Sequence, residues 1–347
     1  MKMKKILTVA AIAVFIAGTL YLLQCLVVPK YMGDVVEGNF MAEYYDSGKD
    51  HDVIFIGDCE VYENFSPQVL WDQYGINSYI RGSAQQLVSQ SYYVLEDTLK
   101  YEKPDVVVFS VLAVPYNEPP KESYNRMTLD GMRWSRTKID AILTSMTEDE
   151  QFLDYIFPLL RYHSRITELT ADDFTYLFHR DPVSHNGYYM RVDARPAENI
   201  PEGRPLPDYS IDAAQMDWLE KIRLLCEEND VELVLIKAPS LYPYWYDQWE
   251  EQIADYAEKH HLLYINLLAL RDEAGLDYQT DTYDGGLHLN LAGAEKLSRY
   301  FGAILQEKCG LADRRNEAPL SIFWEDQAAW YAKDRKMQEE EIAKEGR

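Results

Sequence analysis

The sequence predicts a three-layer α/β/α fold with a five-stranded parallel sheet, a helical insertion after the third strand and an N-terminal transmembrane helix. Short apolar runs rich in β-branched residues alternate with longer helical patterns, which predicts the sheet. An uncharged stretch near the first residue predicts the membrane helix. The five expected strands cover residues 53–56, 77–80, 106–109, 231–236 and 262–265.

The chain begins with a candidate membrane anchor. Three lysines within the first five residues precede an uncharged stretch over residues 6–28, which is long enough to cross a bilayer core of roughly 30 Å. No small-residue cleavage site follows, so a retained anchor is favoured over a cleaved signal. Lipidation at Cys25 is a minor alternative, because Gln24 stands where a lipoprotein signal needs a small residue. The lysines predict a single-pass plasma-membrane protein with a cytoplasmic N-terminus and an extracytoplasmic main domain.

Helices are expected between the strands, and such alternation predicts a flavodoxin-like sheet with right-handed crossovers. Ser66 and Pro67 supply an N-cap and a first-turn proline for the first of these helices. The other expected helices cover residues 85–101, 211–229, 245–260 and 291–305. The alternation lapses over residues 115–209, where aromatic-rich helical patterns predict an insertion with its own core. Residues 187–207, rich in Gly, Pro, Asn and Arg, predict an exposed loop.

These patterns divide the chain into three parts. Residues 1–30 are expected to form the cytoplasmic tail and anchor, residues 31–312 the α/β domain, and residues 313–347 a charged C-terminal tail. The 58 acidic and 34 basic residues give a net charge of −24, which excludes nucleic acid as a partner because binding its phosphates requires clustered basic residues. No HExxH, EF-hand or P-loop pattern occurs, so neither a metal nor another cofactor is expected.

Polar residues follow the predicted strands at the edge where parallel sheets bind ligands. The sequence Gly-Asp-Cys-Glu at residues 57–60 comes after the first strand, Gly82 after the second and Asn117 after the third. Residues 280–290, beyond the fifth strand, contain two aspartates and a histidine. We therefore expect an active site at this edge, with Glu60 facing substrate or solvent.

The residue types in these turns predict nucleophilic catalysis. A sharp turn between strand and helix exposes a nucleophile and directs backbone N–H groups toward a developing oxyanion. Four cysteines are too few and too scattered for a disulfide framework, and among them Cys59 occupies such a turn. A thiol needs a base to become a nucleophile near neutral pH, which we expect to be His288. Either Asp284 or Asp281 is expected to hold the imidazole in its reactive tautomer.

The two motifs resemble blocks of the SGNH/GDSL hydrolases. Residues 54–59 are similar to the first block, in which Gly-Asp-Ser carries the nucleophilic serine, and residues 284–293 are similar to the last block, in which a paired Asp and His complete the triad. The resemblance, over about residues 52–305, implies that Gly82, Asn117 and the backbone N–H of Cys59 donate to the oxyanion.

The resemblance is closest to membrane-anchored members related to the D-alanyl-lipoteichoic acid transfer protein and to alginate-type O-acetyltransferases. It implies a bacterial, extracytoplasmic acyl-ester hydrolase or O-acyltransferase that acts on cell-envelope polysaccharide or teichoic-type polymer. Two departures bear on the chemistry: cysteine replaces serine at position 59, and three residues rather than two separate Asp284 from His288. They support the alternative of a catalytically inactive SGNH-like domain that binds envelope polymer or a membrane acyltransferase partner.

Overall fold

The computed structural model describes residues 2–28, 40–116, 119–179 and 181–345. Its centre is an all-parallel sheet in the order β2-β1-β3-β4-β5, which confirms the predicted fold class. The strands are β1 (Val53–Gly57), β2 (Ser78–Gly82), β3 (Val106–Ser110), β4 (Glu232–Lys237) and β5 (Leu263–Asn266). The chain leaves β1 for β2 on one side and returns to β3 on the other, so the topological switch point lies between β1 and β3. Ligands bind at such points in open α/β sheets.

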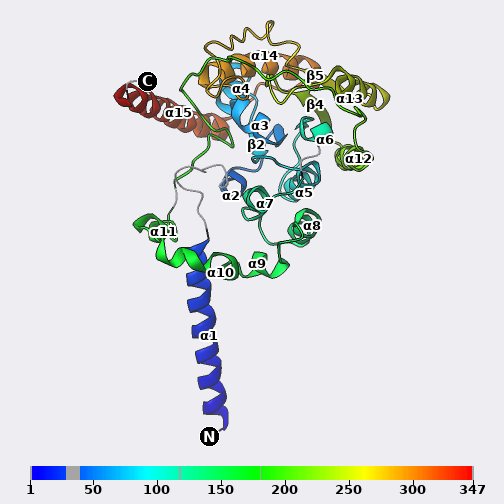
Figure 1. Cartoon of the computed structure of the whole chain (residues 1–347). Coiled ribbons are helices and arrows are strands. Elements are labelled where there is room, and N and C mark those ends of the chain that lie inside the picture. Colours follow the sequence, from blue (N-terminus) through cyan, green and yellow to red (C-terminus); the bar gives the residue numbers. More distant parts are fainter. Residues whose placement is uncertain (1, 29–39, 117–118, 180, 346–347) are drawn as a thin grey trace.

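Helices cover both faces of the sheet (Figure 1). One face is covered by α3 (Cys59–Asn64), α4 (Pro67–Tyr74) and α14 (Leu291–Cys309), and the other by α5 (Val88–Thr98), α12 (Ala213–Glu228) and α13 (Asp247–Lys259). As predicted, α4 begins at Pro67, and its N-cap Ser66 accepts a hydrogen bond from the Val69 backbone N–H.

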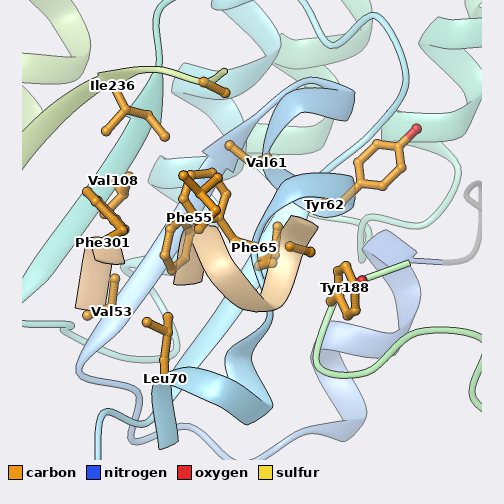
Figure 2. Packing of buried hydrophobic residues seen from close by; sticks show 14 of the residues in the cluster. Val53, Phe55, Val61, Tyr62, Phe65, Leu70, Val108, Tyr188, Ile236 and Phe301 are labelled. Atoms are coloured by element: carbon orange, nitrogen blue, oxygen red, sulfur yellow. The ribbon is translucent and has the colours of Figure 1, made fainter. Parts of the chain in front are cut away.

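Residues along each strand alternate between two apolar cores, one on each face of the sheet. In β1, Phe55 joins the core beneath α4 and α14, whereas Ile54 joins the core beneath α5, α12 and α13. The rings of Phe55, Phe65 and Phe301 pack together in the first core (Figure 2), with centroid distances of 5.0 Å from Phe55 to Phe65 and 5.4 Å from Phe65 to Phe301. This packing fixes α3, and with it the turn after β1.

The chain between β3 and α12 forms a series of short helices. They are α6 (Ala113–Tyr116), α7 (Glu122–Leu129), α8 (Arg136–Ser145), α9 (Phe152–Ile156), α10 (Pro158–Tyr162), the 3-10 helix η3 (His163–Thr167) and α11 (Ala171–Thr175). Tyr155 belongs to a small separate core here, as expected. The same expectation was wrong for Phe157, Phe174 and Phe178, which are 52%, 52% and 89% exposed.

Parts of two segments expected to be exposed or solvated pack against the domain. Tyr188 is fully buried within the predicted exposed loop, and Asn186 accepts a hydrogen bond from the backbone N–H of Ile80 in the edge strand β2. The predicted charged tail is mostly the helix α15 (Ala318–Glu345), in which Trp324 is buried and stacks on Trp71 with centroids 5.5 Å apart. Composition indicates irregular or charged segments, but burial depends on where the fold brings them.

The N-terminal helix α1 (Lys2–Val27) extends away from the sheet (Figure 1). Within the described part of the chain it is the single helix that is long and apolar enough to cross a membrane, and it is therefore a candidate membrane span or signal sequence. The described residues between it and the sheet include α2 (Phe40–Glu43) and the 3-10 helix η2 (Tyr44–Asp46).

Candidate active site

Cys59 begins α3 directly after β1, at the carboxyl edge of the sheet. Its neighbour Asp58 is the N-cap of α3 and accepts a hydrogen bond from the Glu60 backbone N–H at 3.0 Å. Gly82 of β2 pairs with Gly57 of β1 in the sheet register. If residue 82 had a side chain, its Cβ atom would lie 3.1 Å from the carbonyl oxygen of Asp58. Glycine is therefore needed here because β2 packs directly against the turn that carries Cys59.

Asp284 holds His288 from within the same loop. The distance from Asp284 Oδ2 to His288 Nδ1 is 2.7 Å, and Asp284 Oδ1 accepts the backbone N–H of His288 at 2.9 Å and that of Leu287 at 3.2 Å. Gly285 and Gly286 adopt φ angles of +87° and +106°, which favour glycine and form the tight turn between the two side chains. The longer Asp–His spacing is thus accommodated by the turn.

Asp281 lies outside this cluster. Its Oδ2 forms a 2.6 Å ion pair with Lys296 and accepts the backbone N–H of Asp277 at 2.7 Å. The carboxylate is buried and helps to hold the loop against α14. Of the two aspartates that the sequence left open, the structure places Asp284 at His288.

The imidazole of His288 interacts with Cys59. Nε2 is buried and makes no hydrogen bond of good geometry to another described residue, yet charge and hydrogen-bonding interactions with His288 act to lower the pKa of the Cys59 thiol. Burial outweighs them and raises that pKa to about 11, so the resting group is a thiol. Catalytic hydrogen bonds are often long in unliganded sites and tighten when substrate binds.

Glu63 is a second carboxylate beside the imidazole, and the sequence analysis missed it. Its Oε2 lies 3.5 Å from His288 Nδ1 and also accepts a hydrogen bond from the Tyr283 hydroxyl. Burial alone would lower the pKa of His288, but Cys59, Glu63 and Asp284 hold it well above its ordinary value. Glu63 follows Cys59 by four residues on α3, and this spacing, which places both side chains on one helical face, could have revealed it.

Glu60 faces neither substrate nor solvent, so that expectation was wrong. Glu60 and Lys237 are both fully buried and form a 2.6 Å ion pair, and Glu60 also accepts a hydrogen bond from the Ser110 hydroxyl. The pair links the ends of β1, β3 and β4. Burial and the nearby charge of Glu60 raise the pKa of Asp58 to about 7, so this carboxyl is part-protonated near neutral pH.

A cavity of about 400 Å³ opens beside the half-buried Cys59. Its wall is mainly apolar, with Leu112, Trp218 and Leu287 among the lining residues. Asp58 supplies the ionisable carboxyl of this lining, and no Lys, Arg or His of the described chain belongs to it. The cavity therefore suits an uncharged, largely apolar group next to the sulfur atom.

The other expected oxyanion donors are less defined. Gly82 ends β2 next to the Cys59 turn, but it is not part of the cavity lining among the described residues. Asn117 lies outside the described residues. The backbone N–H of Cys59, at the first position of α3, donates no hydrogen bond to a described residue and is available to a ligand. The described chain holds no group of three or more His, Cys, Asp or Glu side chains placed to bind a metal ion.

Fold and site together define an α/β protein with a Cys–His–Asp cluster at the carboxyl edge of its sheet. No protein-family model matches the chain, and no curated protein matches it. One solved structure that it resembles is provisionally described as a lipolytic protein of the G-D-S-L family from Desulfitobacterium hafniense DCB-2. The match covers 74% of this chain and 100% of that chain, at 12% identity and a TM-score of 0.39. A likeness this weak carries no argument about the site, so the roles of the site residues rest on this chain's own geometry.

Proposed function

We propose that this protein is an SGNH-like acyl-ester hydrolase or O-acyltransferase with Cys59 as its nucleophile. The observation that carries the proposal is the convergence of Cys59, the imidazole of His288 and the carboxylate of Asp284 beside a cavity of about 400 Å³. Nucleophile, base and orienting acid are the three roles that acyl transfer requires.

In the proposed reaction, His288 first releases its own proton to solvent, because its pKa is raised. Nε2 of the neutral imidazole then accepts the thiol proton of Cys59, and the sulfur attacks the acyl carbonyl carbon. The carbonyl oxygen then carries the negative charge, which the backbone N–H of Cys59 stabilises by a hydrogen bond. Collapse of this intermediate breaks the ester C–O bond, and the imidazolium returns its proton to the departing alkoxide. Water, or a sugar hydroxyl in a transferase, attacks the resulting thioester with His288 as base, and the thiol is restored.

The cavity supports an uncharged acyl group as the transferred part of the substrate. Its apolar wall offers no positive side chain among the described residues to pair with an anionic acyl group, and an unpaired buried charge is costly. The candidate membrane span α1 supports a site outside the cell, anchored by a cytoplasmic N-terminus. Acylated envelope polysaccharide or teichoic-type polymer is the substrate class that fits this location.

The raised thiol pKa favours a second candidate, a catalytically silent domain that binds envelope polymer or a membrane acyltransferase partner. A pKa of about 11 leaves little thiolate at neutral pH, and the thiolate is the reactive form of cysteine. Such a domain would retain the cavity and lack only the catalytic activity, because one fold can host proteins of different function.

The test uses the full chain with nitrophenyl esters of increasing acyl length and with acetylated polysaccharide. Cys59→Ala and His288→Ala are compared with Cys309→Ala, which removes a half-buried thiol from the end of α14. We expect the first two variants to lose turnover by at least about a thousandfold and the Cys309 variant to match the parent protein. Equal rates in all four proteins would refute the proposal.

Alkylation separates the two candidates further. If the imidazole activates the sulfur, His288→Ala should slow the reaction of Cys59 with iodoacetamide, whereas Cys309 in the same molecule should react unchanged. A Cys59 thiol whose alkylation is indifferent to His288, in a protein that still binds acylated polymer, would establish the silent domain instead.

A further inference from the structure

Exposed apolar side chains gather on the short helices that surround the end of α1. The large apolar residues that are more than half-exposed on α9, α10, η3 and α11, at the junction of α9 and α10 and in the turn after α11 are Leu153, Phe157, Leu160, Ile166, Phe174 and Phe178. We call these six residues the apolar patch. Soluble surfaces rarely gather so many large apolar side chains without a binding partner.

Three of the elements that carry the apolar patch contact α1. Arg165 in η3 donates a hydrogen bond to the carbonyl oxygen of Val27 at 2.9 Å, and α10, η3 and α11 all pack on α1. Val27 is fully buried by these contacts, whereas residues 2–22 of α1 are exposed. In Figure 1, α9, α10 and α11 lie across the point where α1 leaves the domain.

The length of α1 places this junction at the membrane surface. A hydrocarbon core of roughly 30 Å takes up about 20 residues at a rise of 1.5 Å each. Counted from Ile6, which directly follows the last N-terminal lysine, that length ends near Cys25. The exposed part of α1 ends at about the same residue, where the short helices begin to cover it.

We propose that the apolar patch rests on the lipid bilayer, with its side chains inserted at the boundary between headgroups and acyl chains. Apolar side chains on helices that lie in the membrane plane bind lipid in this way. The inference rests on α1 being a membrane anchor and is independent of the chemistry of Cys59. Two attachments restrict the tilt of the domain more than α1 alone, so the catalytic cavity is held at a defined height above the bilayer.

The test is photolabelling of the full chain in vesicles of phosphatidylcholine and phosphatidylglycerol that contain a diazirine phospholipid. Cross-linked peptides are mapped by mass spectrometry. Ile322 and Met337 on α15, 61% and 55% exposed, are matched controls of similar exposure on another surface. We expect peptides of α1 and of the apolar patch to be labelled several-fold more than those of α15. Replacing Phe157 and Phe178 by Ser should remove labelling of the patch and leave that of α1.

Each other outcome overturns the proposal in a recognisable way. Labelling of α1 without labelling of the patch above the level of α15 would show that the patch faces water. Absence of label from both would refute the anchor together with the patch. If the patch is labelled in vesicles but protected in native membranes, a membrane protein rather than lipid is its occupant. Ester turnover, measured on the same samples, reports separately on the proposed chemistry.

Discussion

Asn substitutions at Asp284 and Asp281 should affect different properties: the first should lower activity and the second should lower stability. The comparison tests the proposed roles of the two aspartates. Both lie in the same loop and both carboxylates are engaged, Asp284 by His288 and Asp281 by Lys296. In Asp284→Asn, one oxygen can still accept the two backbone N–H groups. The new amide presents N–H to Nδ1, which favours the tautomer with its proton on Nε2. That tautomer cannot accept the thiol proton.

The size of the effect follows from the groups that remain. Loss of the orienting carboxylate in a hydrolytic triad lowers kcat by about 10⁴-fold. Glu63 stays 3.5 Å from Nδ1 and can partly replace Asp284, so we expect about 10³-fold, which is about 4 kcal/mol of transition-state stabilisation. For Asp281→Asn we expect activity within about twofold of the parent and a loss of about 1–3 kcal/mol in unfolding free energy. The range is modest because Lys296 is partly exposed and its ion pair is screened.

The assay measures kcat/KM for a nitrophenyl ester and urea unfolding on the same preparations of both variants. Near-equal activities, or a larger activity loss in Asp281→Asn than in Asp284→Asn, would refute the assignment of the orienting role to Asp284. A stable but inactive Asp284→Asn protein is the result that the geometry predicts. If the Asp284→Asn protein is unstable, its activity is compared with that of Asp281→Asn, which loses a carboxylate from the same loop.

Three further changes have defined outcomes. Ester turnover should rise as the pH increases above the ordinary imidazole pKa of about 6.5, because the pKa values of Cys59 and His288 are both raised and the pair must lose one proton to react; a flat pH–rate profile would contradict this. Lys237→Met should cost about 3–5 kcal/mol in urea unfolding because it leaves Glu60 buried without the cation of its ion pair, and unchanged stability would contradict a stabilising role of this pair. Trp324→Ala should cost about 3–5 kcal/mol if α15 is integral to the fold, whereas a loss below about 1 kcal/mol would make it an appendage.

The sheet could be predicted because each strand is marked locally. Val53 to Ile56 and Val106 to Phe109 are apolar on both faces, as strands buried between two helical layers must be. Their alternation with helices then predicts that the strands run parallel in one sheet. The packing of α15 could not be predicted, because it depends on Trp324 reaching Trp71 across the sequence, and its charged composition is typical of a solvated tail as well.

Local motifs in the sequence mark part of the candidate site. Cys59 and His288 stand in turns with recognisable sequence, and the structure brings them together with Asp284. The burial of Glu60 could not be predicted, since it requires Lys237 from β4 as a partner. A sequence shows which residues can ionise, whereas only the fold shows which of them share a low-dielectric site.

The burial of Cys59 would suit the proposed location of the site outside the cell. Thiolates are the form that oxidants attack, and burial raises the pKa of Cys59 to about 11, so the resting group is the resistant thiol. The same burial slows the nucleophile unless His288 takes its proton in the reaction. Two carboxylates beside that imidazole stabilise the imidazolium that forms. The same environment would therefore protect the cysteine at rest and stabilise the charge pair that the proposed acyl transfer creates.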